Sequence, residues 1–254
     1  NNRQDEDMFQ IIVDSAANIP AELVKQYNIK VLSFVNYVNG EKLVCFDPEL
    51  TYEEERAKAK TYYDAMRNGA EVKTSLISTG DFEVAFRKVM EAGEDVLYFS
   101  LSKNISGTYN SARIAMEELM ENPPMGRKIR IIDALNASLA QGILAIYASE
   151  MRDRGMEIDE VYDILKTYPA KMNGVFTVGD LKYLAKTGRL SGSACAETSL
   201  RHKSYFCKAD FDRCFSAEQF YIDGCCLLAV IHSLNHTNGI LPDRKSTRLN
   251  SSHT

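Results

Sequence analysis

The pattern of apolar and polar positions predicts strands that alternate with helices along residues 8–194. Continuous apolar runs typical of buried strands occur at 8–14 ("MFQIIVD"), 95–100 ("DVLYFS"), 127–133 ("RKIRIID") and 174–178 ("GVFTV"). Between them lie amphipathic stretches typical of helices, such as 20–28 ("PAELVKQYN") and 109–121 ("YNSARIAMEELME"). Strands separated by helices indicate an α/β fold with a mainly parallel sheet.

Local turn signals add two further elements to this pattern. The alternating segment 29–44 is interrupted by Asn39-Gly40, which predicts a β-hairpin. The charged stretch 47–69 predicts a long helix that ends at Gly69, and a further helix is expected to be capped near Gly80-Asp81.

Polar residues recur where the predicted strands end. They are Asp14-Ser15, the segment from Ser100 to Thr108, and the segment from Asp133 to Ser138. In open α/β sheets, ligands bind beyond the carboxyl ends of the strands. We therefore expect the functional site at this edge of the sheet.

The hydroxyl-rich loop 101–112 ("LSKNISGTYNSA") allows several chemical interpretations. A serine nucleophile needs a base, yet all four histidines follow residue 200 and no G-x-S-x-G is present, so Lys103 is the remaining candidate base for Ser106. Neither phosphate-binding glycine motif occurs, and the Cys and His spacings match no zinc pattern. An anion site at Thr74-Ser75 and Ser106-Gly107-Thr108 remains, as does a simple helix cap by Ser106 or Thr108.

Composition narrows the class of partner. The net charge of −5 argues against a nucleic-acid surface, which needs clustered Lys and Arg. No run approaches the roughly 18 apolar residues of a membrane span, and no signal-peptide pattern opens the chain. We expect a cytoplasmic protein that binds no nucleic acid and has no membrane span.

The regular patterning fades after about residue 194. The segment 243–253 ("DRKSTRLNSSH") can be back-translated into a string that resembles a widely used sequencing adapter. We expect an N-terminal α/β domain at 1–154, the start of a C-terminal domain at 155–194, and an unreliable segment at 195–254. On this interpretation a frameshift precedes the adapter-derived tail, and the second domain is truncated or corrupted.

Five motifs, taken in order, resemble those of the DegV family. They are "IIVDSAANIP" (11–20), "KTSLISTGDF" (73–82), "SLSKNISGTYNSA" (100–112), "IDALNASLAQG" (132–142) and "VGDLKYLAKTGRLSGSA" (178–194). The sequence departs from the family pattern at several positions, among them Ala134, which stands where the family usually has Ser.

The resemblance implies two α/β domains that hold one long-chain fatty acid between them. It implies a carrier that presents the fatty-acid carboxylate to an ATP-dependent fatty-acid kinase, with no catalytic activity and no cofactor of its own. Thr74 and Ser106 would hold the carboxylate, and Gly107 and Thr108 would shape the loop; Arg189 would lie near the head group or the kinase-facing surface. The full set of expected ligand-binding residues is Thr74, Ser75, Ser106, Gly107, Thr108, Ser15 and Arg189. The alternatives are a hydrolase or transferase that acts on an acyl or phosphoryl substrate through Ser106, and a regulatory module whose loops are merely capped.

Overall fold

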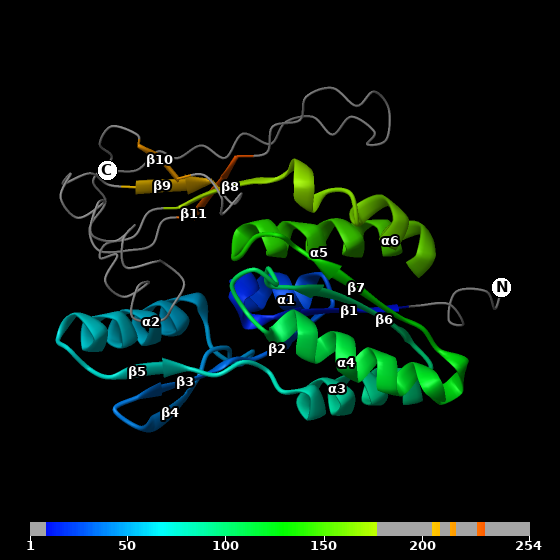
Figure 1. The fold of residues 1–254 in the computed structure, drawn as a ribbon, viewed down its shortest axis with the longest axis horizontal. Coiled ribbons are helices and arrows are strands. Elements are labelled where there is room, and N and C mark those ends of the chain that lie inside the picture. Colours follow the sequence, from blue (N-terminus) through cyan, green and yellow to red (C-terminus); the bar gives the residue numbers. More distant parts are fainter. Residues whose placement is uncertain (1–8, 177–204, 209–213, 217–227, 232–254) are drawn as a thin grey trace.

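The computed structural model describes residues 9–176, 205–208, 214–216 and 228–231 (Figure 1). Its central sheet has four strands in the order β2-β1-β6-β7, and every pair is parallel. These strands are β1 (Phe9–Asp14), β2 (Ile29–Leu32), β6 (Asp95–Ser100) and β7 (Ile129–Asp133). The predicted α/β fold with a parallel N-terminal sheet is confirmed.

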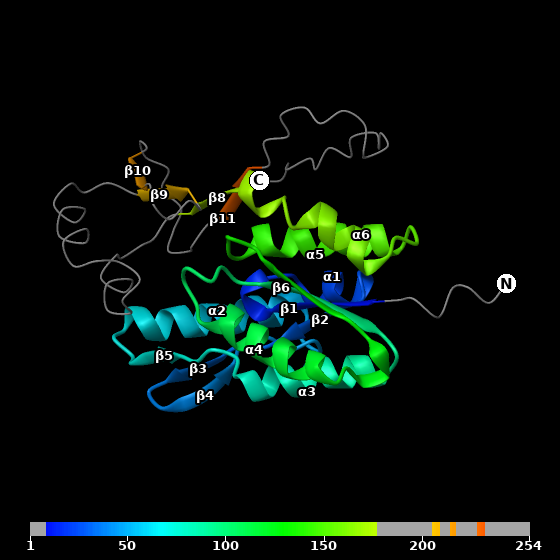
Figure 2. The same ribbon diagram turned by 45° about the vertical axis from the view of Figure 1, so that its right-hand side comes forward.

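Helices cover both faces of this sheet (Figures 1 and 2). One face carries α1 (Ala21–Gln26), α5 (Leu139–Arg152) and α6 (Ile158–Leu165), and the other carries α3 (Thr79–Glu91) and α4 (Thr108–Glu121). Successive residues of a strand point to opposite faces, so Ile11 and Val13 pack in the core beneath α5 while Ile12 packs beneath α3 and α4. Burial on both faces explains why β1 is apolar without alternation.

A second, smaller unit lies at the edge where the central strands end (Figure 1). It consists of a three-stranded sheet in the order β4-β3-β5 and the helix α2 (Tyr52–Arg67). The strands are β3 (Val35–Val38), β4 (Glu41–Val44) and β5 (Val72–Thr74). The predicted hairpin is confirmed, since Asn39 and Gly40 both have the positive φ that its turn requires.

Two helices, α2 and α3, begin at side-chain caps that the sequence supplies. Thr51 caps α2 through a reciprocal capping box with Glu54, and Ser78 caps α3 in the same way with Asp81. No residue of α2 is fully buried, so this helix lies on the surface of the molecule, with one face partly covered.

A third sheet is antiparallel, with the order β10-β9-β8-β11. Its strands are β8 (Asn173–Phe176), β9 (Tyr205–Lys208), β10 (Cys214–Ser216) and β11 (Leu228–Ile231). Short 3₁₀ helices complete the described elements: η1 (Ser15–Ala17), η2 (Pro124–Gly126) and η3 (Pro169–Lys171). The adapter-like tail 243–253 lies outside the described residues, and the proposed boundary near residue 154 and the frameshift remain predictions.

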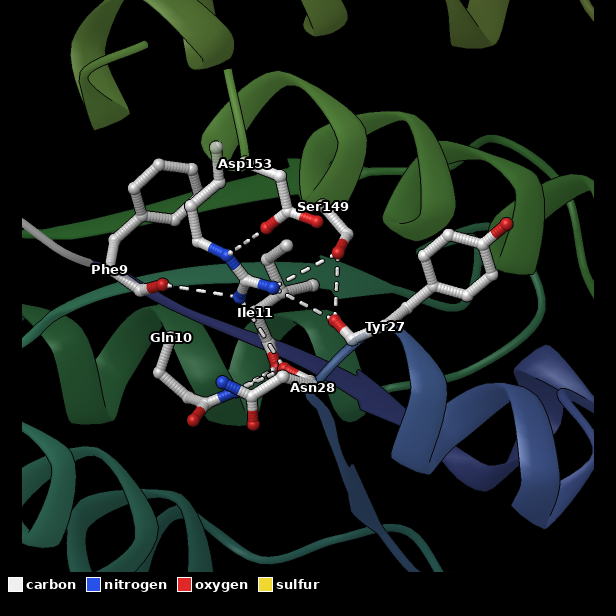
Figure 3. A network of polar contacts seen from close by, with 8 residues as sticks. Phe9, Gln10, Ile11, Tyr27, Asn28, Ser149 and Asp153 are labelled. Carbon is white, nitrogen blue, oxygen red and sulfur yellow. Dashed lines mark hydrogen bonds and ion pairs between the residues drawn. The ribbon is translucent and has the colours of Figure 1, made fainter. Parts of the chain in front are cut away.

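A buried arginine joins the opposite end of the central sheet to α5 (Figure 3). The guanidinium of Arg152 donates to the backbone carbonyls of Tyr27 at 2.9 Å, Asn28 at 3.4 Å and Phe9 at 3.5 Å, and to the Ser149 hydroxyl at 3.0 Å. These carbonyls follow α1 and begin β1; the Tyr27 carbonyl also accepts the Ser149 hydroxyl at 2.8 Å, and the Asn28 carbonyl accepts the Gln10 amide at 2.8 Å. Arg152 therefore fixes three elements at the end of the sheet that lies away from the polar loops.

Candidate ligand-binding site

A cavity of about 650 Å³ lies at the carboxyl ends of β1 and β6, between the central sheet and the smaller unit. Its wall is formed by the end of β1 with η1, the small sheet, one face of α2, and the loops after β5 and β6. This is the edge at which the sequence predicts a site. The volume is in the range of pockets that enclose a small organic ligand.

Five of the seven predicted ligand-binding residues line this cavity. They are Ser15, Thr74, Ser75, Ser106 and Gly107. Thr108 is completely buried behind Ser106 and does not reach the wall. Arg189 lies outside the described residues. The fold thus brings together residues that range from Ser15 to Gly107 along the chain.

The Ser106 hydroxyl is held in place by the first residue of α4. Its Oγ lies 2.8 Å from Thr108 Oγ1 and accepts the Thr108 backbone N–H at 3.2 Å. When Thr108 donates from its hydroxyl as well, Ser106 Oγ accepts twice and its own proton is left for a ligand. A neutral hydroxyl at the positive end of a helix suits a negative head group.

The simple cap interpretation is therefore supported only in part. Ser106 does satisfy one of the first N–H groups of α4, but the residue at the N-cap position is Gly107, which makes no side-chain cap. Gly107 also permits a close approach between the two motifs, because a Cβ there would lie 3.3 Å from Leu76 Cδ2. That contact places the Thr74–Leu76 segment beside Ser106.

Ser15 and Ser75 differ in what they can offer a ligand. Ser15 Oγ accepts the Phe34 backbone N–H at 2.9 Å, which leaves the Ser15 proton available for an anion. Ser75 Oγ instead donates its proton to the Val35 carbonyl at 2.9 Å. Ser75 therefore secures β5 against β3, and Ser15 is the better donor to a carboxylate.

The structure gives Ser106 no base among the described residues. Lys103 lies 3.7 Å from Asp133 Oδ2 and stands 5.8 Å from the centre of the Tyr109 ring, so its ammonium is directed to those two groups. The described residues also include no cluster of three His, Cys, Asp or Glu side chains that could hold a metal ion. Among the described residues, Ser106 Oγ is therefore hydrogen-bonded to Thr108 and to no His, Lys, Asp or Glu side chain.

Sequence reasoning missed the wall that α2 contributes. Tyr52, Glu55, Lys58, Ala59, Tyr62 and Tyr63 all line the cavity. Their spacing of three or four residues is the signal that could have identified this face of the helix. Burial raises the pKa of Tyr62 to about 12, so its phenol stays protonated and presents a neutral ring and hydroxyl.

Asp14 is one of the polar residues that the sequence places at this edge, although it is not among the predicted ligand-binding residues. It lines the cavity, yet its side chain is fully buried. Burial raises the pKa of this carboxyl, while hydrogen bonds from Leu101, Tyr98, Gln141 and Ala16 act in the opposite direction. Asp14 is thus a buried acid whose donors all come from the protein itself.

Comparison with known proteins defines the class to which this fold and site belong. The family model described as "Uncharacterised protein, DegV family" matches residues 8–200. A DegV domain-containing protein of Clostridium perfringens is 38% identical over 193 residues, which are 76% of this chain and 64% of that protein. The DegV domain-containing protein YteA of Lactococcus lactis is 34% identical over 185 residues, with 72% and 61% covered. The chain belongs to the DegV family, and it spans less than two thirds of the length of these relatives.

Solved structures show the same fold. A DegV family protein from Thermus thermophilus, described in terms of fatty-acid binding, is 25% identical with a TM-score of 0.66 over 83% of this chain and 71% of that one. A stearic acid-binding protein from Eubacterium ventriosum is also 25% identical, with a TM-score of 0.66 over 90% of this chain and 72% of that one. No helix within the described part of the chain combines the length and apolar composition needed to cross a membrane.

Proposed function

We propose that this protein binds one long-chain fatty acid in the cavity beside the central sheet. The observation that carries the proposal is that Ser15, Thr74 and Ser106, three hydroxyl residues, line the same cavity as the three tyrosines of α2. The hydroxyls are suited to the carboxylate and the tyrosine rings to the acyl chain. The fatty-acid binding of similar proteins from Thermus thermophilus and Eubacterium ventriosum supports this assignment.

The energetics of such a ligand match this division of the cavity. Each methylene group removed from water contributes about 0.8 kcal/mol, so the acyl chain supplies most of the affinity. The head group needs only a few oriented donors, because neutral hydroxyls avoid the cost of burying a fixed positive charge. Thr74 and Ser106 are the proposed carboxylate ligands, with Ser15 as a third donor.

A carrier role is the second part of the proposal, and the fatty-acid binding of the similar proteins supports it. The protein would hold the fatty acid in the cytoplasm and present its carboxylate to an ATP-dependent kinase that performs the phosphoryl transfer. Arg189 would act at that presentation step, since a guanidinium recognises phosphate and carboxylate groups. Arg189→Ala should therefore leave the bound lipid in place and slow its phosphorylation; loss of the lipid would contradict this role.

Titration with a fluorescent fatty acid tests the binding proposal. Saturable binding at one site per chain is expected, with displacement by palmitic or stearic acid. Thr61→Ala offers a matched control, because the Thr61 hydroxyl is exposed on α2, bonds only within the helix, and does not line the cavity. Absence of saturable binding by a folded chain would refute the proposal.

A further inference from the structure

We propose that Asp14 is a positioning residue that locks the two hydroxyl-bearing loops of the ligand site into one arrangement. The inference rests on the proposed function and extends it to a residue that does not itself hold the ligand. Asp14 is the last residue of β1, between the core of the sheet and the turn that carries Ser15. Its contacts reach both of the segments that meet at the cavity.

The two oxygens of the Asp14 carboxylate bind different parts of the site. Oδ2 accepts the Leu101 backbone N–H at 2.8 Å, at the start of the loop that ends in Ser106. Oδ1 accepts the Ala16 backbone N–H at 3.1 Å, within the turn that begins with Ser15. One rigid group therefore fixes the relative position of the Ser15 turn and the Ser106 loop.

The anchor of this arrangement lies in the core. Tyr98 donates its hydroxyl proton to Asp14 Oδ2 at 2.9 Å, and the Tyr98 side chain is fully buried. Its ring packs against Phe82 and Phe86, with centroids 5.0 Å and 6.0 Å away. Close packing leaves the Tyr98 ring little freedom to move. The Tyr98 hydroxyl therefore holds the Asp14 carboxylate in a fixed position relative to the core.

Both oxygens of the Asp14 side chain must accept hydrogen bonds, because each faces a backbone N–H. An asparagine at position 14 would place an NH₂ group where one oxygen now stands, so it would face either the Ala16 N–H or the Leu101 N–H with another donor. That substitution preserves the shape of the side chain and breaks one of the two loop contacts. It therefore separates loop positioning from packing.

Apart from Leu101, the loop that Asp14 holds is bonded within itself and to the segment that follows β7, where Lys103 donates its backbone N–H to Asp133 Oδ1 at 3.4 Å. Ser102 donates its backbone N–H to the Asn136 carbonyl at 3.0 Å, and Ser106 donates to the Ser102 carbonyl at 3.2 Å. The Leu101 contact is thus the link between this loop and β1, from which the Ser15 turn departs. Without this hydrogen bond, the Ser106 hydroxyl should no longer be held in a fixed position relative to Ser15 and Thr74.

The test compares a carboxylate ligand with a neutral ligand of the same chain length. Displacement of a fluorescent fatty acid by palmitic acid and by 1-hexadecanol gives the preference of each variant for the carboxylate. Asp14→Asn should reduce this preference by roughly tenfold, the effect of about one well-placed hydrogen bond. Loss of packing alone would weaken both ligands equally and leave the ratio unchanged.

Asp95→Asn is the matched control. Asp95 is also a carboxylate on a central strand and accepts the Lys128 backbone N–H at 2.8 Å, but at the opposite end of the sheet. This variant should keep the wild-type preference for the acid. A similar fall of the ratio in Asp95→Asn would overturn the proposal.

A second variant keeps the proposal testable if Asp14→Asn does not fold. Tyr98→Phe removes one donor and leaves both backbone contacts, so hydrogen exchange at the Leu101 amide should accelerate and the preference should fall by about threefold. An unchanged ratio in the folded variants would overturn the positioning role. If the wild-type chain bound neither ligand, the proposed function itself would fail, and the two failures are therefore distinguishable.

Discussion

The hydroxyl oxygens of Ser106 and Thr108 lie 2.8 Å apart, one on the cavity wall and the other fully buried behind it. Together with the Thr108 backbone N–H, which Ser106 Oγ accepts at 3.2 Å, this contact holds the Ser106 oxygen in one position. A preoriented donor costs less to engage than a freely rotating one. Thr108 would thus contribute to binding through Ser106 and without contact of its own.

Removal of the proposed carboxylate donors should weaken fatty-acid binding. Ser106→Ala and Thr74→Ala should each reduce the free energy of fatty-acid binding by about 1–3 kcal/mol. In either variant, one carboxylate oxygen of the bound ligand would lack the hydrogen-bond donor that replaces water. Fluorescence titration measures the effect, and a melting curve on the same samples separates it from loss of helix capping. Wild-type affinity in both variants would count against the assigned head-group position.

Ser15 and Ser75 should respond differently to the same substitution. The Ser15 proton is available to the ligand, whereas Ser75 donates its proton to Val35. Ser15→Ala should therefore weaken the binding of palmitic acid more than that of 1-hexadecanol. Ser75→Ala should lower stability and affect both ligands alike, and the reverse pattern would show that the two roles are exchanged.

The stability of the protein should depend on pH through Asp14. Burial raises the pKa of this carboxyl above its ordinary value of 3.8, so the folded state binds a proton more readily than the unfolded chain. The contribution to the free energy of unfolding is greatest below pH 3.8 and is lost as the pH rises through the raised folded-state pKa. Several exposed acids, among them Asp64 and Glu71, have lowered pKa values and act in the opposite sense.

The contribution of Asp14 to the pH dependence of stability can be measured by comparing the wild type with Asp14→Asn. The difference in unfolding free energy between wild type and Asp14→Asn, measured by denaturant titration at several pH values, removes the contribution of the other acids. This difference should shift in favour of the wild type as the pH falls toward 3.8. A difference that is constant with pH would show that the pKa of Asp14 is not raised.

Arg152 should matter for stability and not for binding. Its guanidinium satisfies backbone carbonyls of Phe9, Tyr27 and Asn28 at the end of the sheet remote from the cavity (Figure 3). Arg152→Met keeps much of the side-chain volume but removes the guanidinium hydrogen bonds, while Ser149 and Gln10 still donate to the Tyr27 and Asn28 carbonyls. The substitution should therefore cost about 2 kcal/mol of unfolding free energy. The affinity of the folded variant for a fatty acid should stay at the wild-type value, and a selective loss of affinity would contradict this division.

The sequence was sufficient to predict the polar edge of the central sheet, but it gave little indication of the elements that form the rest of the cavity wall. Local signals were sufficient for the Asn39-Gly40 hairpin and for the polar residues that follow the buried strands. The cavity face of α2 was hidden because its tyrosines alternate with many charged residues in the linear pattern. The role of Asp14 was hidden for a different reason, since its partners Tyr98 and Leu101 are 84 and 87 residues away along the chain.

The central claim is that the chain holds one long-chain fatty acid, and native mass spectrometry of the purified protein tests it most directly. The account predicts a bound mass equal to one C16–C18 fatty acid per chain, lost on extraction and regained when palmitic acid is added. Ser106→Ala together with Thr74→Ala should retain less of this ligand than Thr61→Ala. A folded chain that carries no such mass, and gains none on addition of palmitic acid, would contradict the account.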